Sequence, residues 1–127
     1  MKSNVSLMTT SPLDSGTVAT LLQVTVARGN LYLIRETCEG FLPGVQAVAL
    51  LDRQDRVLIV PLTPESGGGL LLKIRNARGD RVIHAQEFFR EKGYLEDFVE
   101  RSFPLEWSDE LAALVLQNLT KIPKTAN

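Results

Sequence analysis

A chain of 127 residues, 44% of them hydrophobic, has enough apolar material for one core, and we expect a single domain. Fourteen basic and fifteen acidic side chains leave a net charge of −1, which excludes a general electrostatic attraction to nucleic acid, anionic membranes or acidic substrates. Any binding driven by charge must therefore come from a local patch.

The residues that indicate a cellular compartment point to the cytoplasm. The single cysteine, Cys38, cannot form a disulfide within the chain, and residues 1–17 lack the basic and apolar regions of a signal peptide. No apolar run approaches the roughly 20 residues of a membrane helix. We expect a soluble cytoplasmic protein without membrane contact, whose residues 1–17 and 120–127 form flexible tails.

The first half of the chain reads as two β-hairpins. Apolar and β-branched runs predict strands at residues 22–26, 31–35, 45–51 and 56–62. A turn with Gly29 joins the first pair, and the polar residues 52–55 join the second pair. Residues 36–41 form a short ambiguous piece that Gly40 and Pro43 break, and we read it as partly helical.

A proline and three consecutive glycines in residues 63–69 predict a flexible connector between two halves. After it, strands are expected at residues 70–76 and 81–84, with an Ala-Arg-Gly-Asp turn between them. Residues 86–92 are typical of a short helix that ends at Gly93.

The last segment, residues 102–119, fits two structures. Phe103, Leu105 and Trp107 alternate with polar residues as in a strand, whereas Ser108 could cap a helix that follows it. We favour a hairpin, and the helix remains the alternative.

Parts of the two halves match at an offset of fifty residues. The matching segments are Leu-Leu at residues 21–22 and 71–72, and Ala-Arg-Gly at residues 27–29 and 77–79. We therefore predict a mainly β (α+β) domain in which two tandem hairpin units, residues 18–62 and 70–119, form a small barrel or sandwich with one or two short helices. Independent reuse of glycine-containing turns would explain the same matches.

Residues 73–93 contain a strand, a glycine turn, an apolar strand and a short helix, and an apolar hairpin follows. This order resembles the swapped-hairpin domain of AbrB-type transcription regulators and MazE-type antitoxins. The resemblance implies DNA binding, and it implies that two halves in one chain imitate a dimer of two chains. Two departures are His84, near the place of the usual proline, and Phe88-Phe89, where Leu-Arg is usual.

Residues suited to catalysis or metal binding are scarce. One histidine and one cysteine cannot supply the four ligands of a structural zinc site. Glu36 and Glu39 would raise the pKa of the Cys38 thiol, and His84 at the end of an apolar strand fits a structural or surface role. We predict no catalytic residue, metal or cofactor, although an active site of Asp, Glu, Arg and Ser residues would leave no trace.

One group of charges favours DNA binding. Six cations lie near the two Ala-Arg-Gly turns: Arg28, Arg35, Lys73, Arg75, Arg78 and Arg81. Such a patch can contact phosphates, and Asn30 and Asn76 could reach base edges.

Aromatic residues favour protein binding instead. Exposed hairpin edges, or a surface made of Phe88, Phe89, Tyr94 and Phe98, could contact a protein partner. The function predicted first is therefore a non-catalytic protein-binding or scaffolding module that acts as a homo-oligomer. A DNA-binding regulator or antitoxin is the alternative, and an enzyme with an unrecognised active site is the second alternative.

Overall fold

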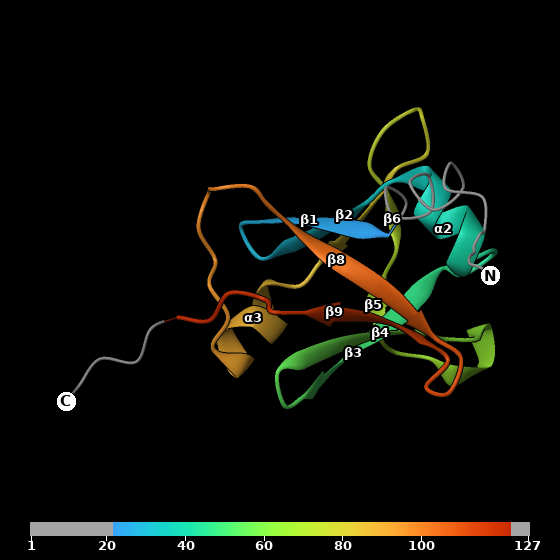
Figure 1. Ribbon diagram of the computed structural model, residues 1–127. Coiled ribbons are helices and arrows are strands. Elements are labelled where there is room, and N and C mark those ends of the chain that lie inside the picture. Colours follow the sequence, from blue (N-terminus) through green and yellow to red (C-terminus); the bar gives the residue numbers. More distant parts are fainter. Residues whose placement is uncertain (1–21, 123–127) are drawn as a thin grey trace, which may run out of the picture.

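The protein is a small, nearly closed β barrel with two short helices, as the computed structural model of residues 22–122 shows (Figure 1). The mainly β prediction is therefore confirmed. Its elements are β1 (Gln23–Ala27), β2 (Asn30–Leu33), α2 (Arg35–Phe41), β3 (Ala47–Arg53), β4 (Arg56–Pro61), the 3-10 turn η1 (Pro64–Ser66), β5 (Leu70–Leu71), β6 (Lys73–Ile74), β7 (Arg81–His84), α3 (Gln86–Lys92), β8 (Arg101–Ser108) and β9 (Ala113–Gln117). Within residues 22–122, neither helix has the length and apolar character needed to cross a bilayer.

A single segment closes the barrel. All strands pair antiparallel in the order β5-β3-β4-β9-β8-β1-β2-β7-β6. The two edge strands, β5 and β6, are separated in the chain only by Leu72, so residues 70–74 pair with β3 at one end and with β7 at the other. This pairing covers part of the two sheet edges, and free edges would otherwise favour association with another chain.

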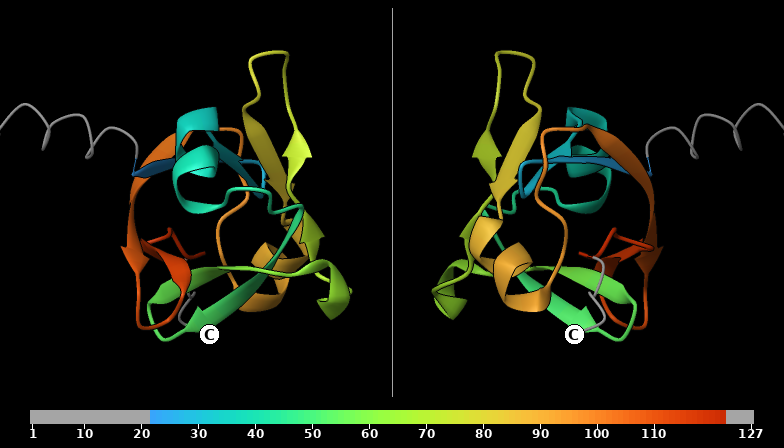
Figure 2. Two further views of the ribbon diagram at one scale, coloured as in Figure 1. Left: turned by 90° about the vertical axis from the view of Figure 1, so that its right-hand side faces the viewer. Right: turned by 90° about the vertical axis from the view of Figure 1, so that its left-hand side faces the viewer.

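The core lies inside the barrel and is built by alternate residues of the strands. Val24, Leu31, Ile59, Ile83 and Leu114 are among the fully buried side chains. The helices α2 and α3 lie on opposite sides of the barrel (Figures 1 and 2), where α2 follows β2 and α3 follows β7. Since strand side chains alternate between faces, the residues between these core positions point outward.

Several predicted elements need correction at their ends. The ambiguous residues 36–41 belong to α2, which begins at Arg35 and therefore shortens the strand predicted at residues 31–35. The strand predicted at residues 70–76 is split into β5 and β6 because its two ends pair with different strands.

The last segment is the predicted hairpin and not a helix. Residues 102–119 form β8 and β9, and Ser108 and Ala113 pair next to the turn that joins them. The Ser108 hydroxyl accepts a hydrogen bond from the Leu111 amide at 3.1 Å. Ser108 thus binds the backbone three residues later, as a helix cap does, but within a turn.

The pairings of the two halves correspond. β1 pairs with β2 of its own half and with β8 of the other half. In the same way, residues 70–74 pair with β7 of their own half and with β3 of the other half. Tyr32 and Val82, fifty residues apart, pair with each other at the centre of β2 and β7. Strands of the two halves therefore alternate around one barrel and do not form separate lobes. Origin of the halves from one duplicated unit stays a prediction.

Candidate functional site

Tyr32 lies at the centre of a polar outer face. Its neighbours on β2, Leu31 and Leu33, point into the core, so the Tyr32 side chain points outward. The Tyr32 hydroxyl accepts hydrogen bonds of 3.1 Å from Arg28 Nη2 and 3.1 Å from Asn30 Nδ2.

A second arginine reaches the same tyrosine from the other half. The Arg75 guanidinium carbon lies 4.4 Å from the centre of the Tyr32 ring, which is the geometry of a cation–π contact. Arg28 and Arg75 are both exposed. One aromatic side chain therefore supports two solvent-facing guanidinium groups.

The strands around Tyr32 carry polar and cationic groups. Across the sheet, Ser102, Thr25, Tyr32, Val82 and Lys73 form one row of paired residues. Lys73 is exposed and has no hydrogen-bond or ion-pair partner within residues 22–122. The strands β1, β2, β6 and β7 contain no carboxylate. We call the outward side chains of these four strands, with Arg28 and Arg75, the Tyr32 face.

The turn that presents Arg28 is held in place on both sides. Arg28 and Gly29 have φ values of 54° and 74°, as a two-residue type I′ hairpin turn requires. The Arg28 amide donates to the Asp97 carbonyl at 2.8 Å, and Gln86 Nε2 donates to the Arg28 carbonyl at 3.1 Å. The backbone is thus anchored while the guanidinium faces solvent.

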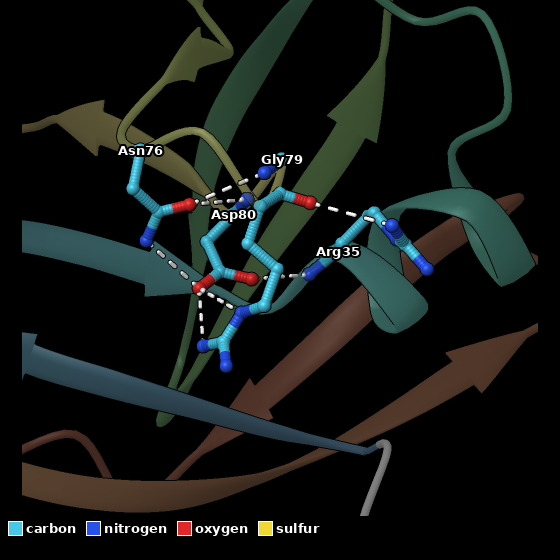
Figure 3. A network of polar contacts seen from close by, with 5 residues as sticks. Arg35, Asn76, Gly79 and Asp80 are labelled. Carbon is cyan, nitrogen blue, oxygen red and sulfur yellow. Dashed lines mark hydrogen bonds and ion pairs between the residues drawn. The ribbon is translucent and has the colours of Figure 1, made fainter.

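The second Ala-Arg-Gly turn is organised around Asp80 (Figure 3). Asp80 Oδ1 accepts a hydrogen bond from the Arg35 amide at 2.9 Å, and Oδ2 accepts from Asn76 Nδ2 at 3.0 Å. Arg78 Nη2 donates to the same Oδ2 at 2.7 Å, which makes an ion pair. Asp80 is only 3% exposed. Hydrogen bonds from Arg78, Asn76 and Arg35 hold the pKa of this carboxyl well below its usual range.

The six predicted cations divide into two groups. Arg28, Lys73 and Arg75 belong to the Tyr32 face, whereas Arg35, Arg78 and Arg81 have other contacts. The charge of Arg78 is compensated by Asp80, and Arg35 forms an ion pair of 3.6 Å with Glu39.

Arg35 contacts the second Ala-Arg-Gly turn, although it follows the first turn in the chain. Its Nη1 donates to the Arg78 carbonyl of the second turn at 3.5 Å, because α2 packs there. Arg81 is half-buried, and its Nη1 donates to the Leu72 carbonyl at 3.0 Å.

The predicted aromatic surface is wrong for two of its four members. Phe89 and Tyr94 are core residues, since Gly93 ends α3 in the left-handed conformation and turns Tyr94 back against Phe89. Phe88 is half-buried and stacks on Tyr94. Only Phe98 is fully on the surface, with 84% of its area exposed. These four residues therefore do not form one surface.

Sequence reasoning missed Tyr32. Its signal is an aromatic side chain at an outward position of β2, two residues after Asn30 and four after Arg28. That spacing places Tyr32 next to the turn cations once the hairpin register is known.

The two side chains weighed for catalysis, Cys38 and His84, lie in different surroundings. Burial raises the pKa of the Cys38 thiol to about 11, despite the opposing effect of the Arg81 charge, so the thiol is protonated at neutral pH. His84 is exposed, and its Nδ1 lies 3.0 Å from Asn30 Oδ1. In the described part of the chain, no three His, Cys, Asp or Glu side chains are grouped to hold a metal ion.

The chain matches no protein-family model, no curated protein and no solved structure.

Proposed function

We propose that the protein is a non-catalytic DNA-binding protein that contacts duplex phosphates through the Tyr32 face. The observation that carries this proposal is the convergence of Arg28 and Arg75, one from each half, on Tyr32. Arginine binds phosphate through its planar donor groups, and contacts to Tyr32 reduce the freedom that each side chain loses on binding.

The charges around the two arginines support the same function. Lys73 adds a third exposed cation in the row of Tyr32, and the four strands carry no carboxylate that would repel phosphate. A chain with a net charge of −1 can bind DNA only through such a local excess of positive charge.

The position of the Tyr32 face suits the symmetry of DNA. The Tyr32–Val82 pair relates the two halves, and strands of both halves flank it. Duplex DNA has local two-fold symmetry, so equivalent elements of two halves can approach the backbones of both strands. The proposal also agrees with the resemblance of residues 73–93 to AbrB- and MazE-type domains.

The test is fluorescence anisotropy of a labelled random duplex at about 50 and 200 mM salt. Three phosphate contacts predict a log–log salt slope of about −2.7, hence roughly a 40-fold loss of affinity between the two conditions. Absence of binding at the lower salt, or an affinity that salt does not change, would contradict the proposal.

A scaffolding homo-oligomer is the second candidate, because one loop exposes two apolar side chains. Phe98 is 84% exposed and Val99 is 55% exposed. The loop is held in place beside them, because the Arg28 amide donates a hydrogen bond to the Asp97 carbonyl. Side chains of this kind are enriched at contacts between protein molecules. We propose a second copy of the chain as the partner.

The solution mass of the wild type and of Phe98→Ser at ~50 µM tests the second candidate. Association that Phe98→Ser abolishes would support it. A monomeric wild type would contradict it, without bearing on DNA binding.

A further inference from the structure

The two halves differ in the connection that follows each helix. Residues 93–100 link α3 to β8, whereas the shorter residues 42–46 link α2 to β3. The longer connection leads into β8, which pairs with β1. Val26 of β1 lies opposite the first residue of β8 and is only 6% exposed. Ile74, which pairs with Arg81 as Val26 pairs with Leu31, is 68% exposed. The shorter connection therefore leaves an opening beside Ile74.

A cavity occupies this opening. Its volume is about 280 Å³, and its apolar walls are Leu42, Val45, Leu72 and Ile74. Arg81 and Glu39 supply the charged groups of the lining. The opening is thus an apolar recess with a guanidinium in its wall.

Arg81 stands where the other half has a core leucine. Val26 pairs with Leu31 in the first hairpin, and Ile74 pairs with Arg81 in the second. Leu31 is fully buried, so the equivalent position points toward the interior of the barrel. A charged side chain at such a position is unfavourable for folding unless it is paired.

The contacts of Arg81 are incomplete. Nη1 donates to the Leu72 carbonyl at 3.0 Å, but Nε is buried and has no hydrogen-bond partner. No carboxylate of residues 22–122 forms an ion pair with Arg81. A half-buried guanidinium with an unpaired N–H is suited to an anion that enters the cavity.

We propose that this cavity binds a small carboxylic acid with an apolar body. The carboxylate would pair with Arg81, and the apolar body would fill the space between Leu42 and Ile74. A volume of about 280 Å³ is that of roughly nine water molecules, at about 30 Å³ for each, so a ligand with one ring and one carboxylate fits. Benzoate has this size and chemistry.

Glu39 opposes the anion without excluding it. Its carboxylate lies 3.6 Å from Arg35 Nε, and its side chain is 68% exposed, so solvent and Arg35 screen its charge. Replacement of Glu39 by glutamine should therefore strengthen binding about two- to threefold. This variant removes the negative charge of the cavity lining and retains Arg81.

The experiment is an NMR titration of the ¹⁵N-labelled full chain with sodium benzoate, with benzamide as the neutral analogue of the same shape. Benzoate should give saturable shifts in residues 42–46 and 72–81, and benzamide should not. Arg81→Leu, which introduces the residue found at position 31, should weaken benzoate binding at least ~10-fold.

A second variant tests the cavity without changing Arg81. If Arg81→Leu fails to fold, Ile74→Trp fills the cavity from its exposed edge, keeps Arg81 and should equally abolish binding. Equal binding of benzamide, unchanged benzoate affinity in Arg81→Leu, or no saturable shift with benzoate would overturn the proposal. Inorganic phosphate that binds as tightly as benzoate would overturn the requirement for an apolar body. None of these outcomes depends on DNA binding.

Discussion

The carboxylate of Asp80, in the turn of the second half, accepts a hydrogen bond of 2.9 Å from the amide of Arg35, the first residue of α2 in the first half. A reciprocal contact joins the other turn and helix. Asn30 Oδ1 accepts a hydrogen bond of 2.7 Å from Gln86 Nε2, and Gln86 is the first residue of α3. Each turn therefore holds the start of the helix in the other half.

Asp80→Asn should lower the free energy of unfolding by about 2–3 kcal/mol, because it removes a buried charge that three groups bind. Urea denaturation measures the change. Asp55→Asn is the matched control, since Asp55 is an exposed turn residue without a hydrogen-bond partner in residues 22–122, and its change should stay within about 0.5 kcal/mol. Equal effects of the two substitutions would contradict the role of Asp80.

The free energy of unfolding should also depend on pH through the ionisation of Asp80. The pKa of Asp80 is lowered in the folded state, so the folded protein binds fewer protons than the unfolded chain. The contribution of Asp80 is complete above the unfolded pKa of about 3.9 and decreases as the pH falls below it toward the folded value. Unfolding curves at several pH values should show the wild type losing its advantage over Asp80→Asn in this range. A constant difference down to about pH 2 would contradict the assignment.

Arg28→Ala combined with Arg75→Ala should weaken binding of every duplex sequence to a similar extent. The salt slope should fall in magnitude by about two, because two phosphate contacts are lost. Anisotropy titrations at several salt concentrations measure both effects. Arg53→Ala with Arg56→Ala is the control, since these exposed arginines flank the β3–β4 turn, away from the Tyr32 face. A loss of affinity in the control alone would place the DNA elsewhere.

Gly69→Ala should destabilise the protein much more than Gly67→Ala. Both glycines have positive φ values, 80° and 68°, so alanine is strained by about 1–2 kcal/mol at either position. At Gly69 the added Cβ would also lie 2.8 Å from the Val48 carbonyl oxygen and would collide with Leu62. A Cβ added at Gly67 would meet no atom within 4 Å beyond its chain neighbours. Thermal unfolding of the two variants measures the difference. Similar melting temperatures would show that the backbone beside Val48 yields to the methyl group.

Cys38 should react slowly with iodoacetamide at pH 8, because its pKa is raised to about 11 and its side chain is buried. The alkylation rate, followed by mass spectrometry, should be at least ~100-fold below that of the same chain in denaturant. A native rate close to the denatured rate would mean that Cys38 is accessible to solvent.

Local patterns in the sequence predicted the elements well. Alternating apolar residues and glycine-containing turns indicated strands on both sides of residues 27–30, and the helix at residues 86–92 with its Gly93 end is found as predicted. These features depend on residues a few positions apart, so one sequence is enough to infer them. The same patterns predicted a mainly β domain, with a small barrel or sandwich as its form, and the structure is the barrel.

Tertiary structure decided which side chains face solvent and which charges remain uncompensated. Arg28, Arg78 and Arg81 look alike in the sequence, yet one contacts Tyr32, one is paired with Asp80 and one lines a cavity. Phe89 and Tyr94 are buried only because the chain folds back after α3. Such differences arise from contacts between residues far apart in the chain, and the local sequence determines only that the strands and turns exist.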